Sequence, residues 1–184
     1  DLTEYTIPNS VSEIGASAFE WCSNLRSVIL PVGVTSIGYR AFAGSGLESI
    51  TIPDGVIEIG DNAFRGCNNL TRVDISDISA WCKISYGGST ANPLCNGAKL
   101  YLDNSEVSEL TIPSDVPVIK LWAFFGCSSL TSITIPDCVT SIENLAFRHC
   151  DNLEHVICLS MTPPAIDDRS FYWANKAIVF DVPN

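Results

Sequence analysis

The segment LESITIPDGVIEIGDNAFRGCNN at residues 47–69 returns as LTSITIPDCVTSIENLAFRHCDN at residues 130–152. Both fit the frame L-x-x-I-x-I-P-x-x-V-x-x-I-x-x-x-A-F-x-x-C-x-x, which the chain repeats about seven times. One unit of this length has no second layer to cover its apolar face, so the units must stack on one another. The repeat therefore predicts an elongated solenoid, a fold that presents a long regular surface and whose default function is binding.

Each copy of the frame, called a rung below, begins at an apolar residue. The second rung is one residue short, and the fourth carries an insertion of 14 residues within 76–106. The seventh drifts after Ser160 but recovers at Ile166 and Phe171, and the apolar stretch 177–182 predicts one further strand. We expect a single domain over residues 1–184, with rungs starting at Leu2, Leu25, Leu47, Leu70, Val107, Leu130 and Leu153.

Within one rung, apolar and polar residues alternate at Ile133-Thr134-Ile135, which is the period of a strand with one buried face. Pro136 follows and ends the strand, because proline has no N–H to donate to a ladder. The small and large pair Ala146-Phe147 suits a short helical turn laid behind the sheet. The rungs should then stack six phenylalanines as an internal column: Phe19, Phe42, Phe64, Phe124, Phe147 and Phe171.

This pattern of Ile-Pro after the strand, then Ile-Gly and Ala-Phe followed by Cys, resembles the bacterial leucine-rich repeats called BspA-like or Treponema pallidum-type. The resemblance covers nearly the whole chain, and segments 77–82, 92–94 and 100–102 resemble an insertion often seen in repeats from gut bacteria. It implies an α/β solenoid, a right-handed superhelix with a parallel β-sheet and about seven rungs. It also implies a secreted or surface-anchored, non-enzymatic protein, often an adhesin. Pro117 and the turn at 103–105, where the family tends to carry Asn-Gly, depart locally from the pattern.

The charge of the chain limits the classes of partner that it can bind. Ten Lys and Arg stand against 21 Asp and Glu, a formal net charge of -11. No basic stripe exists to replace phosphate counterions, which argues against nucleic acid and anionic membranes as partners. No segment approaches the length of a membrane span and no signal peptide is visible. We therefore expect a piece of a longer protein, or a mature form, whose extracellular or cell-surface location follows from the resemblance alone.

The eight cysteines and two histidines do not predict a metal or catalytic site. Four cysteines share one rung position and should form a column of buried free thiols. Cys82 and Cys95, both in the insertion, are the best candidates for a disulfide, with free thiols as the alternative. The rung pattern places His149 and His155 on opposite faces, so zinc is not expected. No motif of a hydrolase, zinc protease or phosphate loop occurs, and we expect no catalytic residue and no cofactor.

Two columns of outward strand positions form the sheet face. Half of their members are Ser or Thr, which can be read simply as β-compatible and soluble. The functional interpretation is that five residues punctuate this surface as ligand contacts: Arg72, Asp74, Glu109, Thr111 and His155.

The insertion is the other candidate, because long departures from a repeat frame often form binding loops. Tyr86 and Tyr101 are its candidate ligand contacts. Trp81 and Leu94 could instead pack a small satellite core, and residues 100–110 are typical of a hairpin turning at 103–104. Three further aromatic residues should be partly exposed on the back of the solenoid: Trp122, Tyr172 and Trp173.

Two classes of function remain open, and in both the chain is expected to be a monomer. The first is an interaction module, an adhesin that binds a host or bacterial surface macromolecule such as an extracellular protein. The second is a carbohydrate-binding or scaffold domain within a larger surface protein, with an enzyme domain beside it as one arrangement. A platform of exposed aromatic residues would favour a glycan, whereas a continuous polar and charged sheet face would favour a protein. We expect the first class, and catalysis by this chain is the weakest interpretation.

Overall fold

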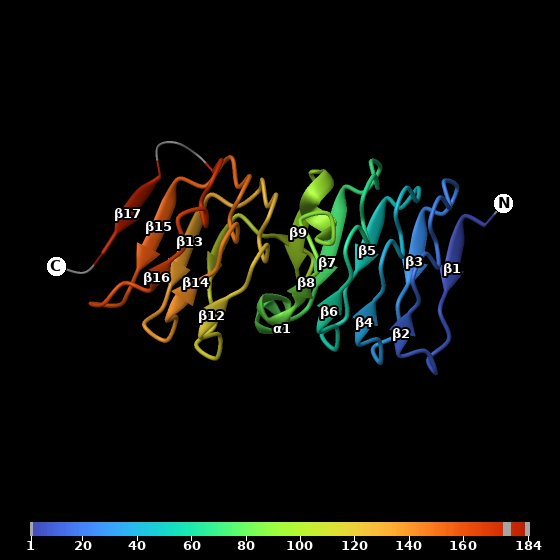
Figure 1. Ribbon diagram of the computed structural model, residues 1–184, viewed down its shortest axis with the longest axis horizontal. Helices are drawn as coiled ribbons and strands as arrows, with labels where there is room; N and C mark the ends of the chain where they lie inside the picture. Colours follow the sequence, from blue (N-terminus) through green and yellow to red (C-terminus); the bar gives the residue numbers. More distant parts are fainter. Residues whose placement is uncertain (1, 175–177, 183–184) are drawn as a thin grey trace.

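The computed structural model describes residues 2–174 and 178–182, and it forms an elongated stack of about eight turns with the two ends of the chain far apart (Figure 1). Two parallel sheets run along the N-terminal part of the stack. The wider one contains β1 (Glu4–Thr6), β3 (Ser27–Ile29), β5 (Ser49–Thr51), β7 (Arg72–Ile75) and β9 (Lys99–Leu102). The narrower one contains β2 (Glu13–Ile14), β4 (Ser36–Ile37), β6 (Glu58–Ile59) and β8 (Ser85–Tyr86).

The C-terminal part repeats this arrangement with two further parallel sheets. The wider sheet contains β11 (Glu109–Thr111), β13 (Ser132–Ile135), β15 (His155–Cys158) and β17 (Val179–Asp181). The narrower sheet contains β12 (Val118–Ile119), β14 (Ser141–Ile142) and β16 (Ala165–Ile166). Below, residues 2–75 are the N-terminal array, residues 76–106 the junction, and residues 107–182 the C-terminal array.

The pairing register confirms the repeat frame. Ile50 lies beside Val73, and Ile133 beside Val156, all in parallel ladders. Each rung therefore buries the same apolar positions as its neighbour, as expected for stacked units. The strand predicted from 177–182 is present as β17, beside β15, although residue 177 lies outside the described residues.

The turns at the Ala-Phe positions differ from the prediction of short helices. They are successive hydrogen-bonded turns in which left-handed residues flank the phenylalanine, such as Arg40 (φ 53°) and Gly44 (φ 66°) around Phe42. A left-handed residue reverses the handedness of the backbone turn, so the N–H groups that follow it point along the stack toward the next rung. Phe42 N–H donates to Ala63 O at 2.9 Å and Gly44 N–H to Arg65 O at 2.8 Å. These turns give the arrays a third ladder, on the side called the turn face below.

The predicted phenylalanine column exists as two separate stacks. Ring centroids lie 5.3 Å apart for Phe19–Phe42, 5.4 Å for Phe42–Phe64, 5.3 Å for Phe124–Phe147 and 5.0 Å for Phe147–Phe171. Between Phe64 and Phe124 lies the junction, whose buried Trp81 and Leu94 occupy the core instead. The predicted packing role of Trp81 and Leu94 is confirmed. The core that they form is not separate, because it is continuous with the cores of both arrays.

Three of the four cysteines in the column are buried and Cys22 is half-buried, and two of them make a hydrogen bond that the sequence pattern does not show. Cys67 Sγ–H donates to Phe42 O at 3.0 Å, and Cys150 Sγ–H donates to Phe124 O at 3.2 Å. A thiol thus satisfies a buried carbonyl of the preceding rung while filling an apolar site. All eight cysteines are free thiols in the structure, so Cys82 and Cys95 are not joined.

The junction holds the only α-helix in the described part of the chain, α1 (Ile78–Lys83), and the 3-10 helix η1 (Pro93–Asn96). Asp77 caps α1 by accepting from the Ser79 and Ala80 amides, and Asn92 caps η1 by accepting from Leu94 N–H. The chain then forms β9 and turns back through β10 (Ser105–Glu106), which pairs antiparallel with β9.

The turn between β9 and β10 places Asp103 at φ 48° and Asn104 at φ 66°. Two left-handed residues in succession are typical of a tight hairpin turn. The predicted hairpin is confirmed. It ends the wide N-terminal sheet, because β10 covers the edge of β9 and β11 starts a new sheet.

Candidate functional site

The sheet face carries the two predicted columns of outward side chains, and β9 extends both of them. Register pairs join Ser49 to Arg72 and Arg72 to Lys99 in the first column. In the second column Asp74 pairs with Tyr101. The strand that follows β7 in space is therefore part of the insertion, which brings predicted residues from two distant segments together.

Arg72, Asp74, Tyr101 and Asn104 form one group, called the sheet-face cluster below. Arg72 Nε donates to Asp74 Oδ2 at 2.7 Å and Arg72 Nη2 to Asp74 Oδ1 at 2.6 Å, a bidentate pair. Nη2 also donates to Asn104 Oδ1 at 3.1 Å, and the guanidinium carbon lies 4.0 Å from the Tyr101 ring centroid. The hydrogen bond with Asp74 raises the pKa of Arg72 above its ordinary value. The side chain is thus held on three sides.

A second ion pair secures the hairpin beneath this cluster. Lys99 Nζ lies 2.9 Å from Glu106 Oε1, and Tyr101 Oη donates to Glu106 Oε2 at 3.4 Å. The bond with Glu106 raises the pKa of Lys99. The sequence analysis missed Lys99, Asn104 and Glu106 because the hairpin that it predicted was not placed beside β7. The alternation in Lys99-Leu100-Tyr101-Leu102 indicates a strand but not its neighbour.

The other predicted sheet-face residues lie on the second wide sheet. Glu109 pairs with Ser132 and Ser132 with His155, whereas Thr111 pairs with Thr134. Glu109, Thr111 and His155 are exposed, and His155 Nδ1 lies 3.9 Å from Asp181 Oδ2. The structure therefore aligns these three residues with one another but separates their sheet from that of Arg72 and Asp74.

Tyr86, predicted as a ligand contact, is a core residue. Its side chain is 7% exposed, and its ring meets Trp81 edge-on with centroids 5.9 Å apart. Burial raises the pKa of the Tyr86 hydroxyl well above its ordinary value. Tyr86 ends the narrow N-terminal sheet and points into the core, so it packs the junction.

The two histidines lie on different faces, as predicted. His155 belongs to β15 on the sheet face, whereas His149 lies on the turn face with its ring 5.5 Å from those of Phe125 and Trp173. Among the described residues, no group of three or more His, Cys, Asp or Glu side chains could hold a metal ion.

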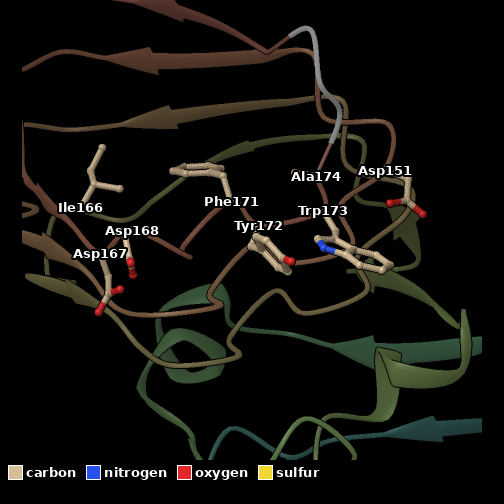
Figure 2. Close-up of a pocket in the computed structure, with 8 residues that line it drawn as sticks. All are labelled: Asp151, Ile166, Asp167, Asp168, Phe171, Tyr172, Trp173 and Ala174. Carbon is tan, nitrogen blue, oxygen red and sulfur yellow. The ribbon is translucent and has the colours of Figure 1, made fainter.

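The turn face carries a pocket of about 1130 Å³ at the C-terminal end of the stack. Figure 2 shows Tyr172 and Trp173 side by side in this pocket, with Asp151 next to Trp173 and Ile166 and Asp167 at the other side. Tyr172 and Trp173 are exposed and Trp122 is half-buried, which confirms the predicted partial exposure of these aromatic residues.

The stacked rungs and their parallel ladders define a leucine-rich repeat solenoid. The family described as BspA type leucine rich repeat region matches residues 1–86 and 97–184 in six copies. The chain therefore belongs to this family, and the unmatched segment 87–96 lies in the junction. No helix of the described residues is long and apolar enough to cross a membrane.

One solved structure shows the same fold, and a second is similar in sequence. The chain is 26% identical to a Treponema pallidum leucine rich repeat protein, with a TM-score of 0.52, covering 84% of this chain and 69% of that one. A leucine rich cell surface protein from Faecalibacterium prausnitzii is 23% identical, with a TM-score of 0.44 and coverage of 100% and 60%. The chain thus spans only 60% of the Faecalibacterium protein's length. A search of curated proteins finds no match.

Proposed function

We propose that this chain is the interaction module of a bacterial surface protein, an adhesin, and that it docks a macromolecular partner on the sheet face. The observation that carries the proposal is the sheet-face cluster, a rigid charged and aromatic group on a surface otherwise rich in Ser and Thr. Arg and Tyr are enriched among the residues that dominate interface energies. We place the centre of the contact at this cluster and its rim at the hairpin and at Glu109.

The cluster is organised before any partner arrives. Three of the five N–H donors of a guanidinium are used inside the cluster, two on Asp74 and one on Asn104. Nη1 makes no hydrogen bond within the part of the chain that the structure describes, and it remains available to a partner. Because Arg72 is already ordered, binding requires little further loss of side-chain entropy.

The charge of the chain indicates the kind of partner. With a net charge of -11, attraction over long range favours a protein with a basic patch. Membership of the BspA-type family supports a surface location, and we propose secretion or surface anchoring for the whole protein. Association should slow as salt is added, because screening shortens the reach of these charges.

The test is a surface plasmon resonance screen of purified extracellular-matrix proteins. Wild type is compared with an Arg72→Ala/Asp74→Ala/Glu109→Ala variant and with a matched Ser27→Ala/Thr51→Ala/Thr134→Ala control from regular rungs. We expect the cluster variant to lose at least about tenfold in affinity for any partner found. The control variant should lose less than about twofold. Equal affinities for all three proteins, or a loss only in the control, would place the contact elsewhere.

We infer further that this chain turns over no substrate. The thiolate is the reactive form of cysteine, and burial raises the pKa of Cys127 to about 11 and that of Cys150 well above its ordinary value. The two histidines lie on opposite faces and cannot act on one substrate. Labelling with a bulky maleimide at pH 7 tests this, since fast modification of Cys127 or Cys150 in the folded protein would contradict it.

A further inference from the structure

One backbone position on the turn face is occupied either by glycine or by a large ring. It follows each core phenylalanine by two residues and always has a left-handed φ, as at Gly44 (66°), Gly66 (71°) and Gly126 (77°). Three other rungs keep the same conformation with an aromatic side chain: Trp21 (60°), His149 (61°) and Trp173 (62°). The left-handed region is unfavourable for a residue that carries a Cβ atom, because the Cβ crowds the following carbonyl oxygen. These rungs therefore keep strained rings where glycine would be easier.

Burial does not offset this strain at the two tryptophans. Trp21 is 75% exposed and Trp173 is 60% exposed. Exposed rings in a strained conformation, at a position that accepts glycine, are better explained by ligand contact than by folding. His149 differs, because it is half-buried between the Phe125 and Trp173 rings.

The N-terminal platform is the Trp21 ring lying flat on Gly44, where a Cβ atom would overlap the ring. Beside it is a hollow of about 200 Å³ bordered by Glu20, Arg40 and Arg65. Arg40 Nη1 lies 3.4 Å from Glu20 Oε1, so charged hydrogen-bonding groups surround the exposed indole.

The C-terminal platform is the pair Tyr172 and Trp173, whose ring centroids lie 5.7 Å apart with planes tilted by 44°. The Arg148 guanidinium carbon lies 5.6 Å from the Tyr172 centroid and 5.8 Å from that of Trp173. Arg148 Nε is buried and has no hydrogen-bond partner among the described residues. Asp151 and Asp167 line the same pocket (Figure 2). The site thus combines exposed ring faces with carboxylates.

We propose that the turn face is a carbohydrate-binding surface with two aromatic platforms, Trp21 and Tyr172–Trp173. A sugar ring presents an apolar C–H face that suits an exposed indole or phenol ring, and its hydroxyls suit the neighbouring carboxylates and guanidinium groups. A cationic ligand fits less well, because Arg148 already lies against both C-terminal rings and would repel a second positive charge.

A polymer fits this surface better than a single sugar. The two platforms occupy the same rung position near opposite ends of the stack, roughly 30 Å apart at the spacing of neighbouring strands. Between them, Gly44, Gly66 and Gly126 project no side chain, whereas His149 adds a ring beside Trp173. A chain long enough to reach both platforms would gain affinity because its second contact is intramolecular.

The test is affinity gel electrophoresis of the full chain in gels containing mucin, xylan, mixed-linkage β-glucan or chondroitin sulfate. We expect at least one polymer to retard the wild type and to change its tryptophan fluorescence. Trp173→Ala and Trp21→Ala should each weaken binding at least about tenfold, and the double variant should migrate as it does without polymer. Both rings are exposed, so circular dichroism should show unchanged folding. An Arg72→Ala/Asp74→Ala variant should bind the polymer like wild type, which separates this surface from the sheet-face contact.

Three results would overturn the proposal. The first is that none of the four polymers retards the wild type. The second is that retardation survives in the double tryptophan variant. The third is that spermine or poly-lysine quenches the tryptophan fluorescence, and that this quenching is abolished by 1 M NaCl and by Asp151→Asn. That outcome would assign the pocket to a cationic ligand instead. Each result leaves the protein partner of the sheet face untouched, so the two proposals fail separately.

Discussion

The regular rungs and the junction solve the same packing problem in different ways. In the arrays, one set of contacts recurs, with stacked phenylalanine rings, parallel ladders and thiol-to-carbonyl bonds such as Cys67 to Phe42. In the junction each contact occurs once. Trp81 Nε1 donates to Ala123 O at 2.9 Å, and Asn92 Nδ2 donates to Trp122 O at 2.8 Å.

This difference separates stability from specificity. On the sheet face, many outward positions of the regular rungs carry Ser or Thr, so much of this surface repeats from rung to rung. The junction interrupts the ladders and brings the β9–β10 hairpin beside β7, where Arg72 and Tyr101 meet. The sheet-face cluster therefore forms where the inserted chain meets a regular rung.

The largest expected effect is on the arrays. Phe64 is fully buried and stacks on Phe42, so Phe64→Ala should lower the free energy of unfolding by about 3–5 kcal/mol. Urea unfolding followed by circular dichroism measures this. A loss below about 1 kcal/mol would mean that the phenylalanine stack does not hold the array together.

The second prediction concerns the buried thiols at high pH. Cys127 has its pKa raised by burial from 9.0 to about 11, so the folded state keeps a proton that the unfolded state loses in this range. Stability is fully present below pH 9 and should fall by about 1.4 kcal/mol per pH unit up to pH 11, about 3 kcal/mol in all for this thiol. Urea midpoints between pH 8 and 11 measure the slope, which should be shallower in Cys127→Ala. Equal slopes in the two proteins would contradict the assignment.

The third prediction tests the junction. Asn92 is fully buried, accepts from Leu94 N–H and donates to the Trp122 and Ala123 carbonyls. Asn92→Ala should destabilise the fold by about 2–3 kcal/mol, because it removes a cap and leaves buried carbonyls with fewer donors. The exposed Asn69→Ala is the matched control and should change stability by less than about 0.5 kcal/mol. Similar losses in both variants would show that Asn92 does not join the arrays.

The sequence predicts the regular rungs well and the junction poorly. The repeat placed the strands, the core phenylalanines and the thiol column, since each position is read many times over. It could not show that Lys99–Leu102 pairs with β7, because that contact occurs once and depends on the path of the inserted chain. For the same reason Tyr86, named as a surface contact, proved to be a core residue. The αL turns were missed because Arg40 and Trp122 give no sign of a left-handed backbone.

The smallest expected effect lies on the surface of the junction. Lys83 Nζ lies 2.7 Å from Asp115 Oδ2, and this lysine lowers the pKa of Asp115. Both side chains are exposed, so Lys83→Met should lower the urea midpoint only slightly, and less in 1 M NaCl. A fall in the midpoint as large as that of Asn92→Ala would mean that this ion pair, rather than the buried Trp81 and Asn92 contacts, ties the arrays together.

The most direct test of the interrupted array is amide hydrogen exchange of the intact protein, measured by mass spectrometry. Residues 109–119 and 132–142 are equivalent segments of adjacent rungs, but only the second has a parallel strand on both sides in each sheet. We expect 109–119 to exchange at least about tenfold faster, because its strands have no ladder toward the junction. Equal protection of the two segments would show that the ladders run through residues 76–106, and that the junction is an ordinary rung of the stack.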